Sequence, residues 1–171
     1  MDIKISPKLY GYISEGQKDL MREGFLLINY INTRREYVLK DYSFIVFPFA
    51  KAYEGFLKQI FLDAGFITEK DYISQHFRIG KVISPNLVRR LGQRSVYKKI
   101  SDIAGSELSD EVWMTWKKGR NEVFHYFPHN LRSLKYPDAR RTVMQIIKTM
   151  ENALEKLHTD ALKHRLNRYL E

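Results

Sequence analysis

One short stretch of the sequence, residues 117–127, contains the side chains best suited to phosphate chemistry. Arg120, Asn121 and His125 lie there among apolar residues. An imidazole titrates near neutral pH, so it can accept and return a proton. A planar guanidinium holds phosphate oxygens through paired hydrogen bonds. The stretch therefore indicates chemistry at a phosphate ester.

The spacing of apolar residues predicts that this stretch belongs to a helix from about residue 110 to residue 126, with Ser109 as its N-cap. Its apolar stripe comprises Val112, Trp116, Gly119, Val123 and Phe127. Gly119 would let a neighbouring helix approach closely. At about 100° per residue, Arg120 and His125 lie about 140° apart on a straight helix. A distorted helix end, a bent Arg120 side chain or the matching helix of a second subunit would bring them together, and we favour the last.

A carboxylate stands out in the preceding part of the chain. Residues 41–64 are predicted to form a long helix that is apolar on nearly every face, so it should be mostly buried. Pro48 either kinks this helix or marks a fresh start. Burying the charge of Glu54 is costly unless a partner is present. We expect that partner to be Arg120 or His125.

The remaining pattern predicts an all-α fold, because no segment shows sustained alternation of apolar and polar residues. Besides the two helices above, we expect helices over 14–34, 68–77, 86–91, 95–103 and 137–169, which gives a bundle of four main helices plus short ones. Residues 1–13 show no pattern of a defined element and are interpreted as an arm. At 171 residues the chain fits a single domain, residues 1–171.

Positive charge is concentrated in one segment, residues 78–99. The formal net charge of the chain is +9, and these 22 residues contribute +7 with no acidic residue among them. The seven cations are Arg78, Lys81, Arg89, Arg90, Arg94, Lys98 and Lys99. Such clustering favours a polyanionic partner over the alternative of an exposed, solvated loop. Phe77 and Tyr97 are weaker candidates for stacking on unpaired bases.

Composition excludes several classes of protein. The chain has no cysteine, so disulfides, thiolate metal sites and a cysteine nucleophile are excluded. No signal peptide or membrane-spanning run is visible, and we expect a cytoplasmic protein with no membrane partner. His125 and His129 are four residues apart, but Pro128 interrupts the helix and no third ligand is placed, so we predict no metal site. Glycine-rich phosphate loops are missing, and no cofactor is expected.

The motif Arg120-Asn121-Glu122-Val123-Phe124-His125 resembles that of the HEPN family of ribonucleases. In that family four residues separate an arginine from a histidine, and the first of the four is small and polar. The segment Lys51-Ala52-Tyr53-Glu54-Gly55-Phe56-Leu57-Lys58 is similar to a helix of the RNase LS branch of toxins, where an acidic residue joins the pair. The resemblance covers the chain from about Ser14 to the C-terminal helix, without the additional N-terminal domains of RNase LS toxins.

This resemblance implies a HEPN-like bundle and a metal-independent endoribonuclease of a toxin–antitoxin or phage-defence system. It also implies a homodimer with a composite active site, and an antitoxin protein as a partner. Arg120 and His125 would be catalytic, Glu54 would orient His125 or fix Arg120, and Asn121 would donate to phosphate or position His125. Lys118 and the seven cations of residues 78–99 would bind RNA. The competing hypothesis is a HEPN-like module that binds nucleic acid or a protein without cutting.

Overall fold

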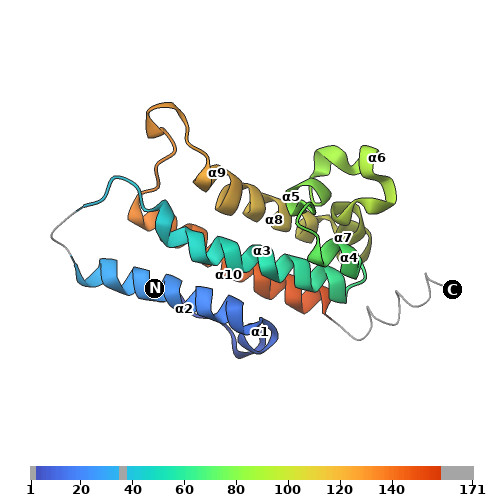
Figure 1. Ribbon diagram of the computed structural model, residues 1–171, viewed down its shortest axis with the longest axis horizontal. Coiled ribbons are helices and arrows are strands. Elements are labelled where there is room, and N and C mark those ends of the chain that lie inside the picture. The colour runs from blue at the N-terminus through green and yellow to red at the C-terminus, as the bar shows by residue number, and fades with distance from the viewer. Residues whose placement is uncertain (1–2, 35–37, 159–171) are drawn as a thin grey trace. The chain divides into compact units, whose positions relative to one another are not determined.

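The computed structural model describes residues 3–34 and 38–158, and it confirms the all-α class, since these two ranges contain no strand. Figure 1 shows the helices in chain order. They are α1 (Pro7–Tyr12), α2 (Glu15–Thr33), α3 (Ser43–Asp63), α4 (Glu69–Ile73), α5 (Ile79–Val82), η1 (Pro85–Leu87), α6 (Val88–Leu91), η2 (Gly92–Arg94), α7 (Val96–Ala104), α8 (Ser106–Trp116), η3 (Lys117–Asn121), α9 (Glu122–Phe124), η4 (Pro128–Asn130) and α10 (Tyr136–Leu157). None of the described helices is long and apolar enough to cross a membrane.

The chain divides into two compact units, each made of two segments. Of the described residues, those up to 55 and 115–148 form the first unit, and 56–114 and 149–158 form the second. All four predicted catalytic residues belong to the first unit. The basic segment, residues 78–99, belongs to the second.

Close packing in the first unit joins α2 to the N-terminal part of α3, as Figure 1 shows. The rings of Phe25 and Phe49 meet edge to face at 5.2 Å between centroids. Phe49 is fully buried, and its ring lies directly over Gly24 of α2. A residue without a side chain is required at this crossing because the ring occupies the space of a Cβ atom.

The N-terminal arm is more ordered than its sequence indicated. Residues 7–12 form α1, and the side chain of Ser6 caps it by accepting a hydrogen bond from the backbone N–H of Leu9. Pro7 occupies the first helical position, where its missing N–H costs nothing. Leu9 and Ile13 are both buried. The prediction that residues 1–13 lack a defined element was therefore wrong.

The two long helices of the first unit begin as predicted. Ser14 caps α2 by accepting a hydrogen bond from the N–H of Gln17. Asp41 lies just before α3, and its carboxylate accepts hydrogen bonds from the backbone and the hydroxyl of Ser43. Pro48 lies inside α3, so it does not mark a fresh start.

Local signals in the second unit are also confirmed. Thr68 and Asp71 form the predicted capping box at the start of α4, although this helix ends at Ile73 instead of Phe77. The helices expected over 86–91 and 95–103 correspond to η1 with α6 and to α7. The Glu111 carboxylate of α8 accepts hydrogen bonds from Thr149 and Asn152 of α10.

The last two long helices differ from their predicted limits. α8 begins at Ser106, so Ser109 lies inside it, buried, and its hydroxyl donates to the Ser106 carbonyl instead of capping the helix. α10 runs from Tyr136 to Leu157, and its predicted continuation to Tyr169 lies outside the described residues. The apolar stripe predicted for α10 is buried at Val143, Ile146, Ile147, Met150, Leu154 and Leu157.

The α2–α3 crossing generates a stability prediction. A Cβ atom at Gly24 would lie 2.6 Å from Cζ of Phe49, so Gly24→Ala should destabilise the protein by about 1–3 kcal/mol through overpacking. Gly16 lies in the same helix with nothing within 4 Å of an added Cβ atom, so Gly16→Ala should be neutral or slightly stabilising. Chemical denaturation of both variants measures the difference. Equal stabilities would contradict this packing.

Candidate active site

The regular α-helix ends at Trp116, and the next five residues form a π-helical turn, η3 (Lys117–Asn121). The backbone N–H of Glu122 donates to the carbonyl of Lys117, five residues back. α9 then adds only Glu122–Phe124, and His125 has extended backbone angles, φ −93° and ψ 125°. The single straight helix predicted over 110–126 is therefore wrong.

This break in the helix changes the directions in which the Arg120 and His125 side chains point relative to each other. A π-turn contains an additional residue, so positions beyond it are rotated relative to an α-helix. His125 also lies beyond the last helical residue. The 140° separation expected from helical spacing does not apply. Both side chains instead line one pocket of about 380 Å³ within a single chain. Of the three arrangements considered from sequence, the distorted helix end is the one observed.

Residues from α3 complete this pocket, and all of its lining belongs to the first unit. The lining residues are Phe47, Ala50, Lys51, Glu54, Arg120, Phe124 and His125. The pocket combines three nitrogen-bearing side chains with one carboxylate and aromatic rings. We call it the 54/120/125 pocket.

Arg120 is held from three directions. Its guanidinium Nη2 lies 3.6 Å from Oε2 of Glu54, and its Nη1 donates a long hydrogen bond of 3.4 Å to Oδ1 of Asn121. The guanidinium carbon also lies 5.2 Å from the centre of the Trp116 ring, within cation–π range. These contacts fix the direction of the guanidinium while leaving part of it open to a ligand.

Glu54 has the cationic partner that the sequence predicted, but it is not sequestered. Its side chain is 36% exposed and that of Arg120 is 41% exposed. An ion pair of this exposure contributes at most about 1 kcal/mol to stability. The pair therefore serves better to orient Arg120 than to stabilise the fold.

His125 is exposed, and no hydrogen bond joins it to another residue in the described ranges. Its imidazole is therefore available to a ligand in the pocket. Glu54 forms an ion pair with Arg120, and within the described ranges no hydrogen bond or ion pair joins it to His125. Of the two roles expected for Glu54, fixing Arg120 is the one that the contacts support.

Lys51 is a pocket residue that the sequence analysis missed. It lies one helical turn before Glu54 on α3, and its exposed side chain lines the same pocket. The i, i+3 spacing from Glu54 was the available signal, because residues three apart share a helical face. A second cation beside Arg120 increases the affinity of the pocket for anions.

Gly119 explains how the π-turn is accommodated against α10. It is buried, and an added Cβ atom would lie 3.2 Å from Cδ1 and Cγ1 of Ile146. The close approach that the sequence predicted for Gly119 is confirmed.

Two exposed aromatic residues stand at the rim of the pocket. Phe47 of α3 is 53% exposed and Phe124 of α9 is 40% exposed. Their rings meet edge to face at 5.5 Å. This pair couples the two elements that carry Glu54 and His125.

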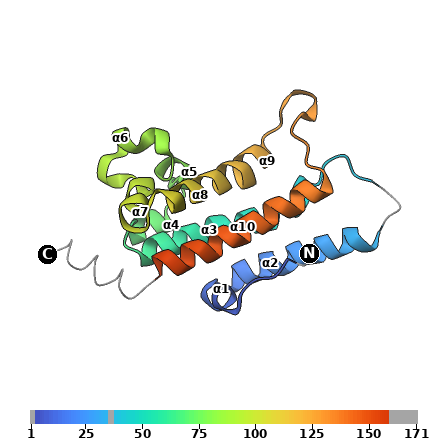
Figure 2. The ribbon, with the colours of Figure 1, turned by 180° about the vertical axis from the view of Figure 1, so that it is seen from behind.

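A loop from His125 to Lys135 follows the site, and Figure 2 shows it as a long excursion between α9 and α10. Asp41 anchors it by accepting hydrogen bonds from Nδ2 of Asn130 and from the backbone N–H of Leu134. His129 and Asn130 adopt positive φ angles of 58° and 52°. Asp41 thus connects the start of α3 to the loop that continues from His125.

The candidate RNA-binding residues occupy different environments. Arg78, Lys81 and Arg94 line one cavity of the second unit, while Arg89 and Arg90 are exposed on α6. Lys98 pairs with Asp102 at 2.6 Å, and the half-buried Lys99 donates to the carbonyl of Phe66 at 2.8 Å. Burial lowers the pKa of Lys99. Lys118 lines a separate cavity with Glu122 and Arg132, apart from the 54/120/125 pocket.

A search for three or more histidine or acidic side chains placed to hold a metal ion finds none among the described residues. No protein-family model matches the chain, and neither a curated protein nor a solved structure is significantly similar to it.

The anchor of the loop generates a prediction with a defined pH dependence. Burial alone would raise the pKa of Asp41, but hydrogen bonds from Ser43, Asn130 and Leu134 outweigh it and lower the pKa. A carboxylate with a lowered pKa stabilises the folded state above the pKa of the unfolded chain. This contribution is lost as pH falls through the lowered value. Asp41→Asn should therefore reduce the free energy of unfolding by about 1–2 kcal/mol at pH 7, and by progressively less below about pH 4.

Asp102→Asn provides the control, because Asp102 forms only an exposed helix-surface pair with Lys98. It should change stability by less than about 0.5 kcal/mol at either pH. Urea denaturation at pH 7 and pH 3 distinguishes the two variants. An Asp41→Asn deficit that is as large at pH 3 as at pH 7 would contradict an ionised anchor.

Proposed function

We propose that this chain is a metal-independent endoribonuclease of HEPN type, which cleaves RNA through attack of a ribose 2′-OH on the adjacent phosphate. The observation that carries the proposal is that Arg120, His125, Glu54 and Lys51 surround one pocket in a single chain. The pocket contains Arg120 and His125 of the sequence motif and adds Glu54 and Lys51 from α3, and this combination favours phosphodiester chemistry.

The pocket supplies the groups that this reaction needs. His125 takes the proton from the 2′-OH, the 2′-oxygen bonds to phosphorus, and the bond from phosphorus to the 5′-oxygen breaks. The leaving 5′-oxygen takes a proton from water, and the resulting hydroxide takes the proton that His125 holds, which gives a 2′,3′-cyclic phosphate and a 5′-hydroxyl end. Arg120 stabilises the negative charge that builds on the phosphate oxygens. Because the nucleophile is the 2′-OH, DNA can bind but is not cut.

Three further side chains assist His125 and Arg120. Glu54 fixes the guanidinium of Arg120 at 3.6 Å, so the cation is oriented before substrate binds. Asn121 does not line the pocket, and it acts by accepting a hydrogen bond from the same guanidinium. Lys51 lines the pocket and adds a second positive charge.

RNA is held outside the pocket by the cations proposed from sequence. Arg89 and Arg90 are exposed on α6 and are suited to phosphate contacts, whereas Arg78, Lys98 and Lys99 already have partners. We therefore assign the larger part of strand binding to Lys81, Arg89, Arg90 and Arg94, and a smaller part to Arg78, Lys98, Lys99 and Lys118. Binding of this kind is sequence-independent and weakens with salt.

A homodimer remains part of the proposal. Phe47 and Phe124 expose large apolar rings at the rim of the pocket, and such surfaces on soluble proteins mark contact sites. A second copy would cover these rings and bring the two pockets next to each other, as the HEPN resemblance implies. The same resemblance supports a role as the toxin of a toxin–antitoxin or phage-defence system, in the cytoplasm, with an antitoxin protein as inhibitor.

The test is cleavage of single-stranded RNA by purified protein in the presence of a chelator. His125→Ala should slow cleavage at least about 100-fold, because the proton acceptor is lost. Arg120→Ala should slow it about 100-fold or more, because charge on the phosphate is no longer stabilised. Cleavage rates and the end groups of the products are measured together, and single-stranded DNA should remain intact.

His129→Asn is the matched control, since His129 is exposed four residues after His125 and asparagine tolerates its positive φ. This variant should cut RNA at the wild-type rate. RNA that is bound but left equally intact by wild type and both alanine variants would favour the non-catalytic module instead. Sedimentation of the same preparation measures pairing, and a monomer at micromolar concentration would contradict the composite site.

A further inference from the structure

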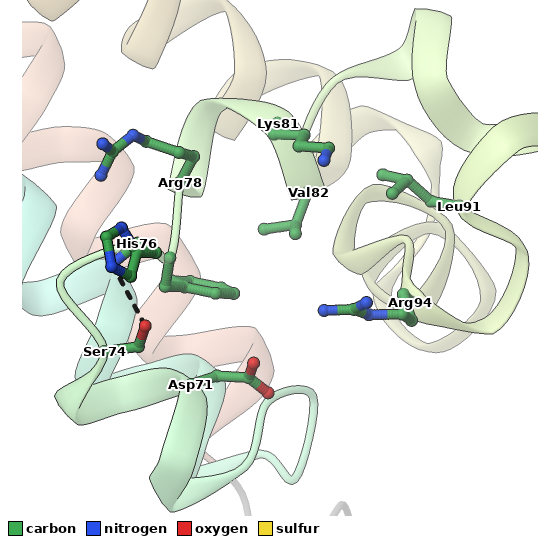
Figure 3. Close-up of a pocket in the computed structure, with 9 residues that line it drawn as sticks. Asp71, Ser74, His76, Arg78, Lys81, Val82, Leu91 and Arg94 are labelled. Carbon is green, nitrogen blue, oxygen red and sulfur yellow. Dashed lines mark hydrogen bonds between the residues drawn. The ribbon is translucent and has the colours of Figure 1, made fainter.

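A second cavity, in the second unit, has the chemistry of a nucleotide site. It has a volume of about 250 Å³ and is lined by Asp71, Ser74, His76, Phe77, Arg78, Lys81, Val82, Leu91 and Arg94. Figure 3 shows Arg94 reaching into it from one side, with Lys81 and Asp71 facing it from α5 and α4. Arg78 points away, and its guanidinium donates to the carbonyl of Gln75 at 2.8 Å.

The cations of this cavity are available to a ligand. Neither the guanidinium of Arg94 nor the ammonium of Lys81 donates a hydrogen bond or forms an ion pair within the described part of the chain. Two unsatisfied cations on opposite sides of one cavity match the oxygens of a phosphate group. An arginine in this position offers two parallel N–H groups to one phosphate.

The remaining lining residues favour a ligand that has an apolar ring in addition to a phosphate. Phe77, Val82 and Leu91 supply apolar surface, and the half-exposed ring of Phe77 has no aromatic partner among residues that the structure describes. Bases stack on rings of this kind regardless of sequence. The cavity therefore offers an apolar surface for a base beside cations for a phosphate.

Asp71 also favours a ligand with a base over a bare phosphate. Its Oδ2 is occupied by the backbone N–H and the hydroxyl of Thr68, whereas Oδ1 accepts no hydrogen bond from the described residues. A carboxylate weakens the binding of a bare anion. The same oxygen can accept a hydrogen bond from an N–H group of a base. The cavity thus discriminates in favour of ligands that combine N–H donors with negative charge.

We propose that this cavity binds one nucleotide, with the base on Phe77 and the phosphate between Arg94 and Lys81. The nucleotide is either a free mononucleotide or an unpaired nucleotide of an RNA strand. The second source rests on the proposed ribonuclease function, whereas the first is independent of it.

The experiment titrates the full chain with AMP, with inorganic phosphate and with a short single-stranded oligoadenylate RNA, using the His125→Ala background to prevent cleavage. Arg94→Gln and Phe77→Leu should each weaken AMP or RNA binding about tenfold, through loss of the phosphate contact and of the stacking ring. Lys70→Gln also removes one positive charge from the second unit, but Lys70 is exposed on α4 and lies outside the cavity, so this variant should weaken binding by less than about threefold.

Each result decides the proposal. AMP binding that depends on Arg94 and Phe77 supports a free nucleotide, and the same dependence seen only with RNA supports a strand contact. Phosphate that binds as tightly as AMP would overturn it, and so would a Lys70→Gln loss equal to that of Arg94→Gln or no binding of any probe. Circular dichroism of each variant confirms folding. Wild-type protein that does not cut RNA would contradict the ribonuclease proposal and leave AMP binding unaffected.

Discussion

The site depends on one hydrogen bond of the backbone, from the N–H of Glu122 to the carbonyl of Lys117. A regular helix would direct Arg120 and His125 to different sides. The π-turn contains Arg120 and changes the rotation of the residues after it, and His125 lies beyond the last helical residue. Such turns cost hydrogen-bond quality and often occur at functional sites, where the local conformation has a use. Here the use is a pocket to which both side chains contribute.

Neighbouring contacts stabilise this unusual turn. The buried Gly119 lets Ile146 of α10 approach at a distance that a larger residue would not permit. Trp116 and Glu54 hold the guanidinium of Arg120, and Asp41 ties the loop beyond His125 to the start of α3. The irregular backbone is thereby fixed at both ends. A site held in this way is preorganised for a charged substrate, because the cations are positioned before binding.

The sequence predicted what local chemistry determines. Ser14 and the Thr68–Asp71 box were recognisable because capping depends on a few adjacent residues. The partner of Glu54 was also predictable, since a carboxylate among apolar residues requires a cation. The π-turn was not, because helical spacing assumes a constant number of residues per turn. The exposure of Glu54 and the cavity at Arg94 depend on tertiary packing, to which no local pattern points, whereas the spacing of Lys51 from Glu54 was a local signal for its place in the pocket.

The most direct test of the 54/120/125 pocket as a ribonuclease site uses an RNA with one 2′-deoxy substitution at a mapped cleavage position. The account predicts that cleavage stops at that position only, while neighbouring positions are cut and yield 2′,3′-cyclic phosphate ends. In this account His125 removes the proton of the 2′-OH, so an RNA position without that hydroxyl cannot be cleaved. Cleavage that continues at the deoxy position would show that the nucleophile is not the 2′-OH and would contradict the proposed chemistry.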